Sequence, residues 1–359
     1  MLLLLSLLAL VAALVKPSLL RFPSRKRAGI TLGGVILALL FLIALVPSAV
    51  ALAIAYGRAL RHGWIAYGLT ALLLTFSIGY GFLRLQRPVL GVETAIGLAS
   101  VDDAIGLQAR ASYASKILQM YDWHVASLAA QGAQVVVLPE KVALLTPPMA
   151  LQWQQHFSAL ALQNRIWLEV GVGIDDGKSP ANWAWLFTPE GELALSYQKH
   201  HMSPPERRER FSPGTDYSVQ TVEGRSYGVA ICKDMHFAAL GRAYGQRGAA
   251  VMLVPAWDFD YLDDWMESRT TVVRGIENGY AVVRPAREGL LTVSDAYGRI
   301  LAERPSSAMP GSSLLAKVVV ASPLSTLYTR IGNLFGWLCV AAAAFFVLRS
   351  RYGRNEVLV

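Results

Sequence analysis

The chain has 359 residues, few cysteines and few charges. Its two cysteines, Cys232 and Cys339, lie in different segments, so the sequence offers no disulfide framework. Only 16% of the residues are charged, against roughly 25% in an average soluble domain, whereas 54% are hydrophobic. A basic patch interleaved with aromatic residues is also missing, so the net charge of +8 does not indicate binding to nucleic acid.

The apolar residues are concentrated in four runs, at residues 2–15, 28–56, 64–83 and 331–348. The last three reach or exceed the roughly 18 residues that cross a bilayer core as a helix. The first resembles a secretory signal peptide, but its basic residues follow the apolar run and no small-residue cleavage site is evident. We therefore predict about three transmembrane helices before a central domain and one after it. Because basic residues flank both ends, charge does not assign the orientation, although it favours anionic lipid headgroups.

The central segment predicts a layered α/β domain without internal repeats. Strand-like runs at residues 94–100, 133–138 and 166–172 alternate with helix-like stretches at residues 112–131 and 149–164. Further strands are expected at residues 183–188, 193–198, 226–232, 249–254, 280–284 and 289–294, with another helix at residues 238–246. A Pro-Glu-Gly-Glu turn at residues 189–192 predicts a hairpin between two of these strands.

Three polar residues follow strand-like runs of this domain: Glu140, Lys199 and Cys232. An α/β sheet presents side chains to a cleft at such strand ends. A thiol needs a base to become a nucleophile, and the oxyanion formed by its attack needs a positive donor beside it. Each residue alone also fits a structural role, as a helix cap, a solvated strand end or a small buried side chain. Together they predict a base in Glu140, an oxyanion-stabilising ammonium in Lys199 and an acyl-carrying thiol in Cys232.

These residues and their surroundings resemble the nitrilase, or carbon-nitrogen hydrolase, superfamily. The resembling segments follow the family order and lie at residues 132–140, 199 with 211–214, 232–234, 248–256, 274–279 and 294–300. The resemblance implies an α-β-β-α four-layer sandwich, in which Cys232 follows a strand at the start of a helix. It also implies that the backbone N–H of Lys233 points into the cleft beside Lys199.

The resemblance adds supporting residues to the predicted site. Glu206 is the expected second glutamate, which would position substrate or assist the base, with Glu209 as its rival. Asp234 matches the family's acidic position two residues after the cysteine, where it would orient the loop or take part in catalysis. Lys233 stands where the family has an aromatic residue, so the substrate preference is open.

The sequence predicts no metal site and no cofactor. His200 and His201 are adjacent, and neighbouring residues of a strand point to opposite faces of the sheet. A third ligand at zinc-like spacing is not apparent. His236 could pair with the thiol, but the glutamate already supplies a base, so packing on a helix surface is expected.

Residues 322–333 contain a Tyr-x-Arg-x-Gly-Asn pattern before the last apolar run, which resembles the apolipoprotein N-acyltransferase branch. That branch implies a membrane-bound thiol acyltransferase, which takes an acyl chain from a phospholipid and passes it to a lipoprotein or another amine. It implies a catalytic domain on the periplasmic side of the bacterial inner membrane. The expected domains are residues 1–90 in the membrane, 91–327 as catalytic domain and 328–359 as a final helix with a basic tail. The membrane region is shorter than that branch carries, so a membrane-tethered amidohydrolase is the alternative, and a degenerate binding or scaffold protein is a third.

Overall fold

The structure, a computed structural model, describes residues 72, 75–76, 78–222, 224–259, 264–321, 323–334, 336–338, 340–341 and 344–345. The chain divides into two compact units, Met1–Leu83 and Arg84–Val359, and the fold described here belongs to the second. The apolar runs at residues 2–15 and 28–56 lie outside the described residues, and those at 64–83 and 331–348 lie partly outside. Within the described segments, no helix combines the length and apolar character needed to cross a membrane.

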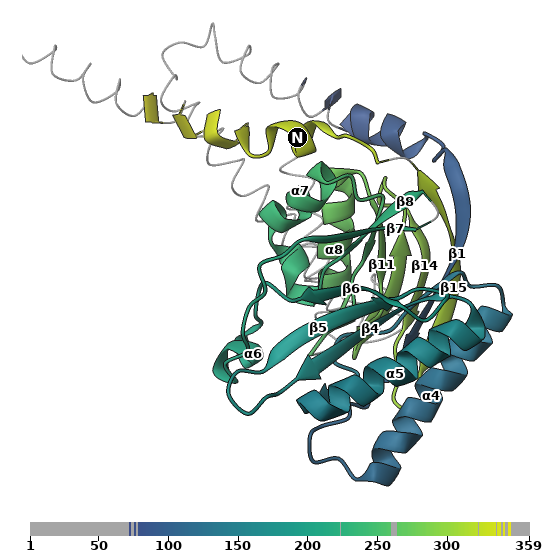
Figure 1. The fold of residues 1–359 in the computed structure, drawn as a ribbon. Helices are drawn as coiled ribbons and strands as arrows, with labels where there is room; N and C mark the ends of the chain where they lie inside the picture. The colour runs from purple at the N-terminus through teal and green to yellow at the C-terminus, as the bar shows by residue number, and fades with distance from the viewer. Residues whose placement is uncertain are drawn as a thin grey trace, which may run out of the picture. The chain divides into compact units, whose positions relative to one another are not determined.

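Two β-sheets form the centre of the Arg84–Val359 unit (Figure 1). The first sheet has the strand order β15-β1-β2-β4-β5-β6, with β3 pairing to β4. Its strands are β1 (Gly91–Ser100), β2 (Val135–Val137), β3 (Leu144–Leu145), β4 (Trp167–Ile174), β5 (Ala181–Phe187), β6 (Leu193–Gln198) and β15 (Ser312–Ala321).

The second sheet has the strand order β14-β13-β11-β9-β8-β7. Its strands are β7 (Ser218–Val222), β8 (Arg225–Val229), β9 (Val251–Leu253), β11 (Ala281–Arg284), β13 (Leu290–Ser294) and β14 (Ile300–Pro305). A short parallel pair, β10 (Ala256–Trp257) with β12 (Ala286–Arg287), continues beyond β9 and β11.

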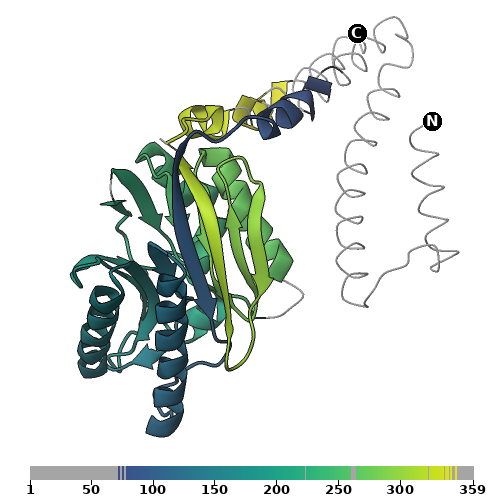
Figure 2. The same ribbon diagram turned by 90° about the vertical axis from the view of Figure 1, so that its right-hand side faces the viewer.

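Helices cover the outer face of each sheet, so the described domain is an α-β-β-α sandwich (Figure 2). The first sheet carries α4 (Ala111–Ala130) and α5 (Pro147–Asn164), and the second carries α7 (Ala238–Gln246) and α8 (Asp264–Asn278). Shorter helices are α6 (Pro204–Arg208), the 3-10 helix η2 (Cys232–His236) and α9 (Leu327–Ile331). The predicted mixed α/β class with α-β-β-α layers is confirmed.

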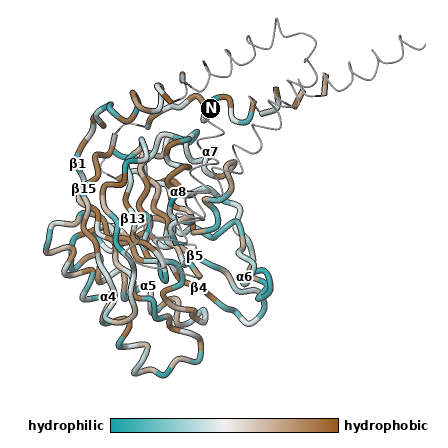
Figure 3. Tube along the Cα trace, turned by 180° about the vertical axis from the view of Figure 1, so that it is seen from behind, coloured by the Kyte–Doolittle hydropathy of each residue, from teal (hydrophilic) through white to brown (hydrophobic). Residues whose placement is uncertain are grey.

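Side-chain alternation along the strands explains the layers. In β2, Val135 and Val137 face the core between the sheets, while Val136 packs beneath α4 and α5. In β9, Val251 and Leu253 face the same inter-sheet core, whereas neighbouring Met252 packs beneath α7. Strands buried on both faces read as continuous apolar runs, and Figure 3 shows the sheet around β13 as largely hydrophobic and α6, on the other side of the view, as hydrophilic.

The predicted elements agree with the structure over most of the domain. The hairpin of β5 and β6 is antiparallel, as expected. The longest strand pairing, β15 with β1, was not predicted, because it joins residues more than 210 positions apart. Helix α8 was not predicted as an element either.

Candidate active site

The backbone of the Glu140 segment, which carries the predicted base, packs closely against strand β4. Glu140 lies just beyond β2, and its backbone N–H donates to the carbonyl of Ala256 at 3.3 Å. Gly171 of β4 lies directly against it, because a Cβ atom at Gly171 would stand 2.5 Å from the carbonyl oxygen of Pro139 and 2.8 Å from the Cα of Glu140. Contacts this short cannot form, so the glycine is what admits the Glu140 segment to its position.

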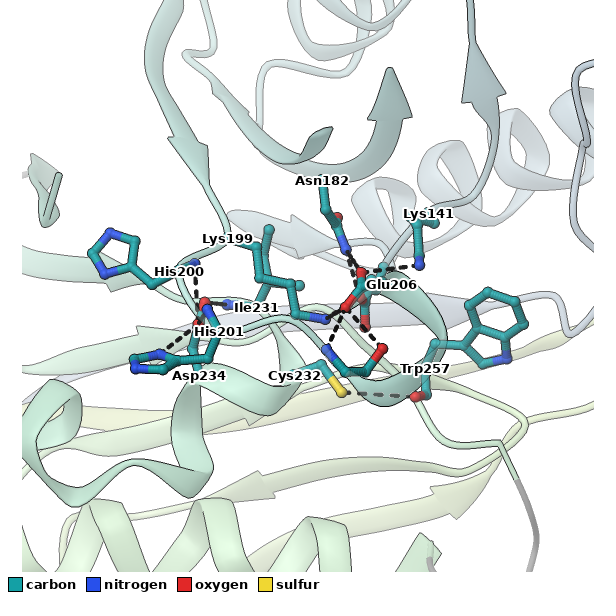
Figure 4. A network of polar contacts seen from close by, with 12 residues as sticks. Lys141, Asn182, Lys199, His200, His201, Glu206, Ile231, Cys232, Asp234 and Trp257 are labelled. Atoms are coloured by element: carbon teal, nitrogen blue, oxygen red, sulfur yellow. Dashed lines mark hydrogen bonds and ion pairs between the residues drawn. The ribbon is translucent and has the colours of Figure 1, made fainter. Parts of the chain in front are cut away.

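Lys199 lies between two carboxylates at the centre of the site (Figure 4). Its Nζ donates to Oε1 of Glu140 at 2.7 Å and to Oε2 of Glu206 at 2.8 Å, and all three side chains are buried. Burial alone would lower the pKa of Lys199, but the carboxylates of Glu140 and Glu206 outweigh it and raise the pKa. The ammonium is therefore charged at neutral pH.

Asn182 of β5 is a member of this network that the sequence analysis missed. Its amide nitrogen donates to Oε1 of Glu140 and to Oε1 of Glu206, each at 2.6 Å, and the side chain is completely buried. The signal in the sequence was an asparagine inside an aromatic, strand-like run, where an amide side chain needs buried partners.

Glu206 lies in the network, and its rival Glu209 is exposed. Glu206 belongs to the short helix α6, where its Oε2 accepts hydrogen bonds from the backbone N–H and the hydroxyl of Ser203, both at 2.8 Å. Burial would raise its pKa, but Lys199 and Lys141 outweigh this and hold the pKa well below its usual range. Glu206 is therefore a carboxylate throughout the neutral range.

Cys232 begins η2 directly after the strand-like run that contains β8, in an uncommon backbone conformation with φ of 43°. Such a conformation costs free energy in a residue with a Cβ and is common where function demands it. Its N–H donates to the carbonyl of Pro255 at 3.0 Å, and its Sγ lies 3.7 Å from the carbonyl oxygen of Trp257. Burial and the carboxylate of Glu140 raise the pKa of the thiol, while Lys199 and Arg284 lower it by less. The resting group is therefore a thiol, which needs a base before it reacts.

Asp234 connects the turn that carries Cys232 to the end of β6. Its Oδ2 accepts from the hydroxyl of Tyr197 at 2.8 Å and from the N–H of Ile231 at 3.1 Å. Its Oδ1 accepts from the N–H groups of His200 at 3.2 Å and His201 at 2.7 Å. The expectation that the two histidines lie on a strand is wrong, because β6 ends at Gln198 and the chain bends there to reach Asp234.

Lys233 and His236 lie on η2 beside the thiol. The Nζ of Lys233 is 3.1 Å from Nδ1 of His236, whose Nε2 contacts the carboxylate of Glu267 on α8. The ring of His236 thus connects Lys233 on the same 3-10 helix with Glu267 on α8. No group of three or more metal-binding side chains occurs among the described residues.

The sequence analysis also missed a buried ion pair near the thiol. Arg284 donates to both carboxylate oxygens of Asp258, from Nη1 at 2.9 Å and from Nη2 at 2.5 Å. Its positive charge is one of the two that favour the thiolate of Cys232. The site thus combines a buried thiol, two carboxylates and several cations. Covalent acyl transfer needs groups of these kinds.

Comparison with known proteins agrees with this geometry. Residues 98–309 match the carbon-nitrogen hydrolase family, which is more than half of the chain. The chain belongs to the carbon-nitrogen hydrolase family. An amidase from Nesterenkonia sp. has the same fold, with a TM-score of 0.55 and 22% identity over 66% of this chain and 94% of that chain.

Two curated relatives differ in activity. An apolipoprotein N-acyltransferase of Geobacter metallireducens is 26% identical over 302 residues, covering 77% of this chain and 57% of that protein. An (R)-stereoselective amidase of Pseudomonas sp is 33% identical over 132 residues, covering 34% of this chain and 47% of that protein. The chain thus spans about half the length of these two relatives.

Proposed function

We propose that this carbon-nitrogen hydrolase family member is a membrane-bound thiol acyltransferase. It forms an acyl thioester on Cys232 from a phospholipid and passes the acyl chain to an amine, as in lipoprotein N-acylation. The observation that carries the chemistry is the buried ammonium of Lys199 between Glu140 and Glu206, next to the thiol. The choice of transferase is supported by a match to an acyltransferase that extends well beyond the residues of the family domain.

The first half-reaction begins with Glu140 as the base. Its carboxylate accepts the thiol proton of Cys232, and the sulfur attacks the ester carbonyl carbon of the phospholipid. The ammonium of Lys199 and the backbone N–H of Lys233 then stabilise the oxyanion. When the C–O bond breaks, the departing oxygen takes the proton from Glu140, and a lysophospholipid leaves the thioester behind.

In the second half-reaction an amine replaces the thiolate. The amine nitrogen attacks the thioester carbonyl, and Glu140 accepts a proton from that nitrogen. The C–S bond breaks, the thiolate takes the proton back from Glu140, and the amide product leaves. Glu206 and Asp234 assist throughout, Glu206 by holding Lys199 and Asp234 by holding the turn that carries Cys232.

The proposed setting is the bacterial inner membrane, with a periplasmic catalytic domain. About three helices within residues 1–90 and one within 328–359 anchor the catalytic domain of residues 91–327. Support comes from the length and apolarity of the three later runs. Reporter fusions after Gln86 and after Val359 test the topology, and a cytoplasmic signal at Gln86 contradicts the lipoprotein role.

The second candidate is a membrane-tethered amidohydrolase that uses the same residues. It is favoured by the match to a curated amidase and by the fold shared with the Nesterenkonia enzyme. Here Cys232 attacks the carbonyl carbon of an amide, the C–N bond breaks, and the departing nitrogen takes the proton from Glu140. Water then replaces the amine in the second step.

Trapping the thioester separates the two candidates. The purified full chain in detergent is incubated with phospholipid carrying a labelled acyl chain, and label on Cys232 is measured by mass spectrometry. We expect label on the wild-type protein and on Cys339→Ala, none on Cys232→Ala, and its release by an added amine. Absence of a labelled adduct together with turnover of small amides supports the amidohydrolase and contradicts acyl transfer.

A further inference from the structure

Lys141, which directly follows the predicted base, was not singled out in the sequence but is built into the site. Its backbone adopts a left-handed conformation with φ of 48°, which is uncommon for a residue with a side chain. The side chain is buried, and its Nζ donates to Oε1 of Glu206 at 3.0 Å (Figure 4). A strained residue at an active site whose side chain also forms a buried ion pair calls for a functional explanation.

A cage of aromatic and cationic side chains holds Lys141 in place. Its ammonium lies 4.9 Å from the ring centroid of Phe211 and 5.2 Å from that of Trp257. Arg287, also buried, stacks on Trp257 at 4.2 Å and donates from Nη1 to the backbone carbonyl of Lys141 at 2.5 Å. The aromatic faces stabilise a cation without neutralising it. The charge of Lys141 is therefore available to Glu206.

The ion pairs around the two glutamates are unequal. Glu140 and Glu206 share Lys199 and share the neutral amide of Asn182. Glu206 has Lys141 as a second cation, whereas in the described part of the chain Glu140 has no second ammonium or guanidinium within ion-pair distance. The two carboxylates are thus in different electrostatic surroundings although they lie in one network.

We propose that Lys141 is a positioning residue that neutralises Glu206 and thereby leaves Lys199 free to stabilise the negative charge that develops on Cys232 and on the oxyanion. The inference rests on the proposed role of Cys232 as nucleophile, but not on the identity of the acyl donor or acceptor.

The charge count gives the physical reason. With the thiol protonated, Lys141 and Lys199 balance Glu140 and Glu206. When the thiol proton moves to Glu140, the thiolate pairs with the ammonium of Lys199, and the carboxylate of Glu206 is still neutralised by Lys141. Without Lys141, the thiolate and Glu206 compete for one ammonium in a buried site, where like charges repel strongly.

The test is the rate at which iodoacetamide alkylates Cys232 in the full-length protein in detergent, followed by intact-protein mass spectrometry. Lys141→Met keeps most of the side-chain volume but removes the charge, and we expect it to slow alkylation at pH 7 by about tenfold, the effect of a shift of one unit in pKa. Exposed Lys178, in the nearby β4–β5 loop, supplies the control, and Lys178→Met is expected to react at the wild-type rate.

The double variant Lys141→Met with Glu206→Gln distinguishes charge from packing. Because Glu206→Gln removes the carboxylate that competes for Lys199, the double variant is expected to react faster than Lys141→Met alone. Should Lys141→Met not fold, Lys141→Gln, which keeps a donor without the charge, replaces it with the same expectation.

The outcomes separate the inference from the proposed function. Equal rates for Lys141→Met and Lys178→Met overturn the inference. Slow alkylation of Lys141→Met that Glu206→Gln does not relieve overturns it too, because a packing defect is not corrected by removing a charge. Wild-type protein that is alkylated at Cys232 but forms no thioester contradicts only the proposed acyl transfer, whereas wild-type protein that is not alkylated contradicts both.

Discussion

Two fully buried glutamates of this protein, Glu206 in the active site and Glu169 in the core, differ in their partners and in the direction of their pKa shift. Glu206 accepts from two ammonium groups, an amide and Ser203, and its pKa is held low. Glu169 lies in β4, and neither of its carboxyl oxygens has a hydrogen-bond partner among the described residues. Burial therefore raises the pKa of Glu169 well above its ordinary value. Equal burial thus accompanies opposite shifts of the pKa, and the partners of each carboxyl decide the direction.

The largest effect is expected from removing the cation that the two active-site carboxylates share. In Lys199→Met, Glu140 and Glu206 lose their common partner, and the oxyanion loses its proposed donor. We expect thioester formation to fall by about 10²–10³-fold, the usual effect of losing one oxyanion donor. Single-turnover labelling with the acyl donor measures this, with exposed Lys116→Met on α4 as control. A loss of less than threefold would contradict the central role of Lys199.

A smaller effect is expected from displacing one carboxylate while keeping all charges. Gly171→Ala places a methyl group against the carbonyl of Pro139 and the Cα of Glu140, so the segment must shift. Thioester formation is expected to fall by about 10²-fold at most, because misplacement by an ångström costs about that much. Gly106→Ala, at a position where a Cβ meets nothing within 4 Å, is the matched control. Equal rates in the two variants would mean that Glu140 does not need this placement.

The smallest effect concerns stability and has opposite sign for the two glutamates. The raised pKa of Glu169 means that its contribution to stability is full below its ordinary value of 4.5 and is lost as pH rises above it. The lowered pKa of Glu206 gives a contribution present above that value and lost as pH falls below it. Glu169→Leu is therefore expected to raise the free energy of unfolding at pH 7 by about 1–3 kcal/mol, the cost of an unpaired buried polar group.

Denaturant unfolding of the purified protein between pH 5 and pH 8 measures this last effect. The free energy of unfolding of the wild-type protein should fall as pH rises, and in Glu169→Leu this fall should be smaller. Glu206→Gln should have a lower free energy of unfolding at pH 7 than the wild-type protein. If Glu169→Leu is no more stable than wild-type protein at pH 7, Glu169 has a partner that these contacts do not include.

Sequence patterns were sufficient for the residues whose meaning depends on local context. Glu140, Lys199 and Cys232 each end a strand-like run, and the ordered segments around them pointed to the family and to its mixed α/β fold. Asn182, Lys141 and Arg284 were missed because each looks unremarkable in its own segment. Asn182 lies in a hairpin strand, Lys141 in a turn and Arg284 at the end of a buried strand, and only distant partners make them part of the site.

The sequence by itself determined most of the strands and helices, the apolar runs and the residue types that face the site, because periodicity and strand ends are local properties. The tertiary structure alone decided which carboxylate has two cations, that Gly171 admits Glu140, and that the two histidines bend toward Asp234. Those features depend on distances between segments far apart in the chain. Distance and burial set the strength of electrostatic interactions, and neither quantity is contained in a local pattern.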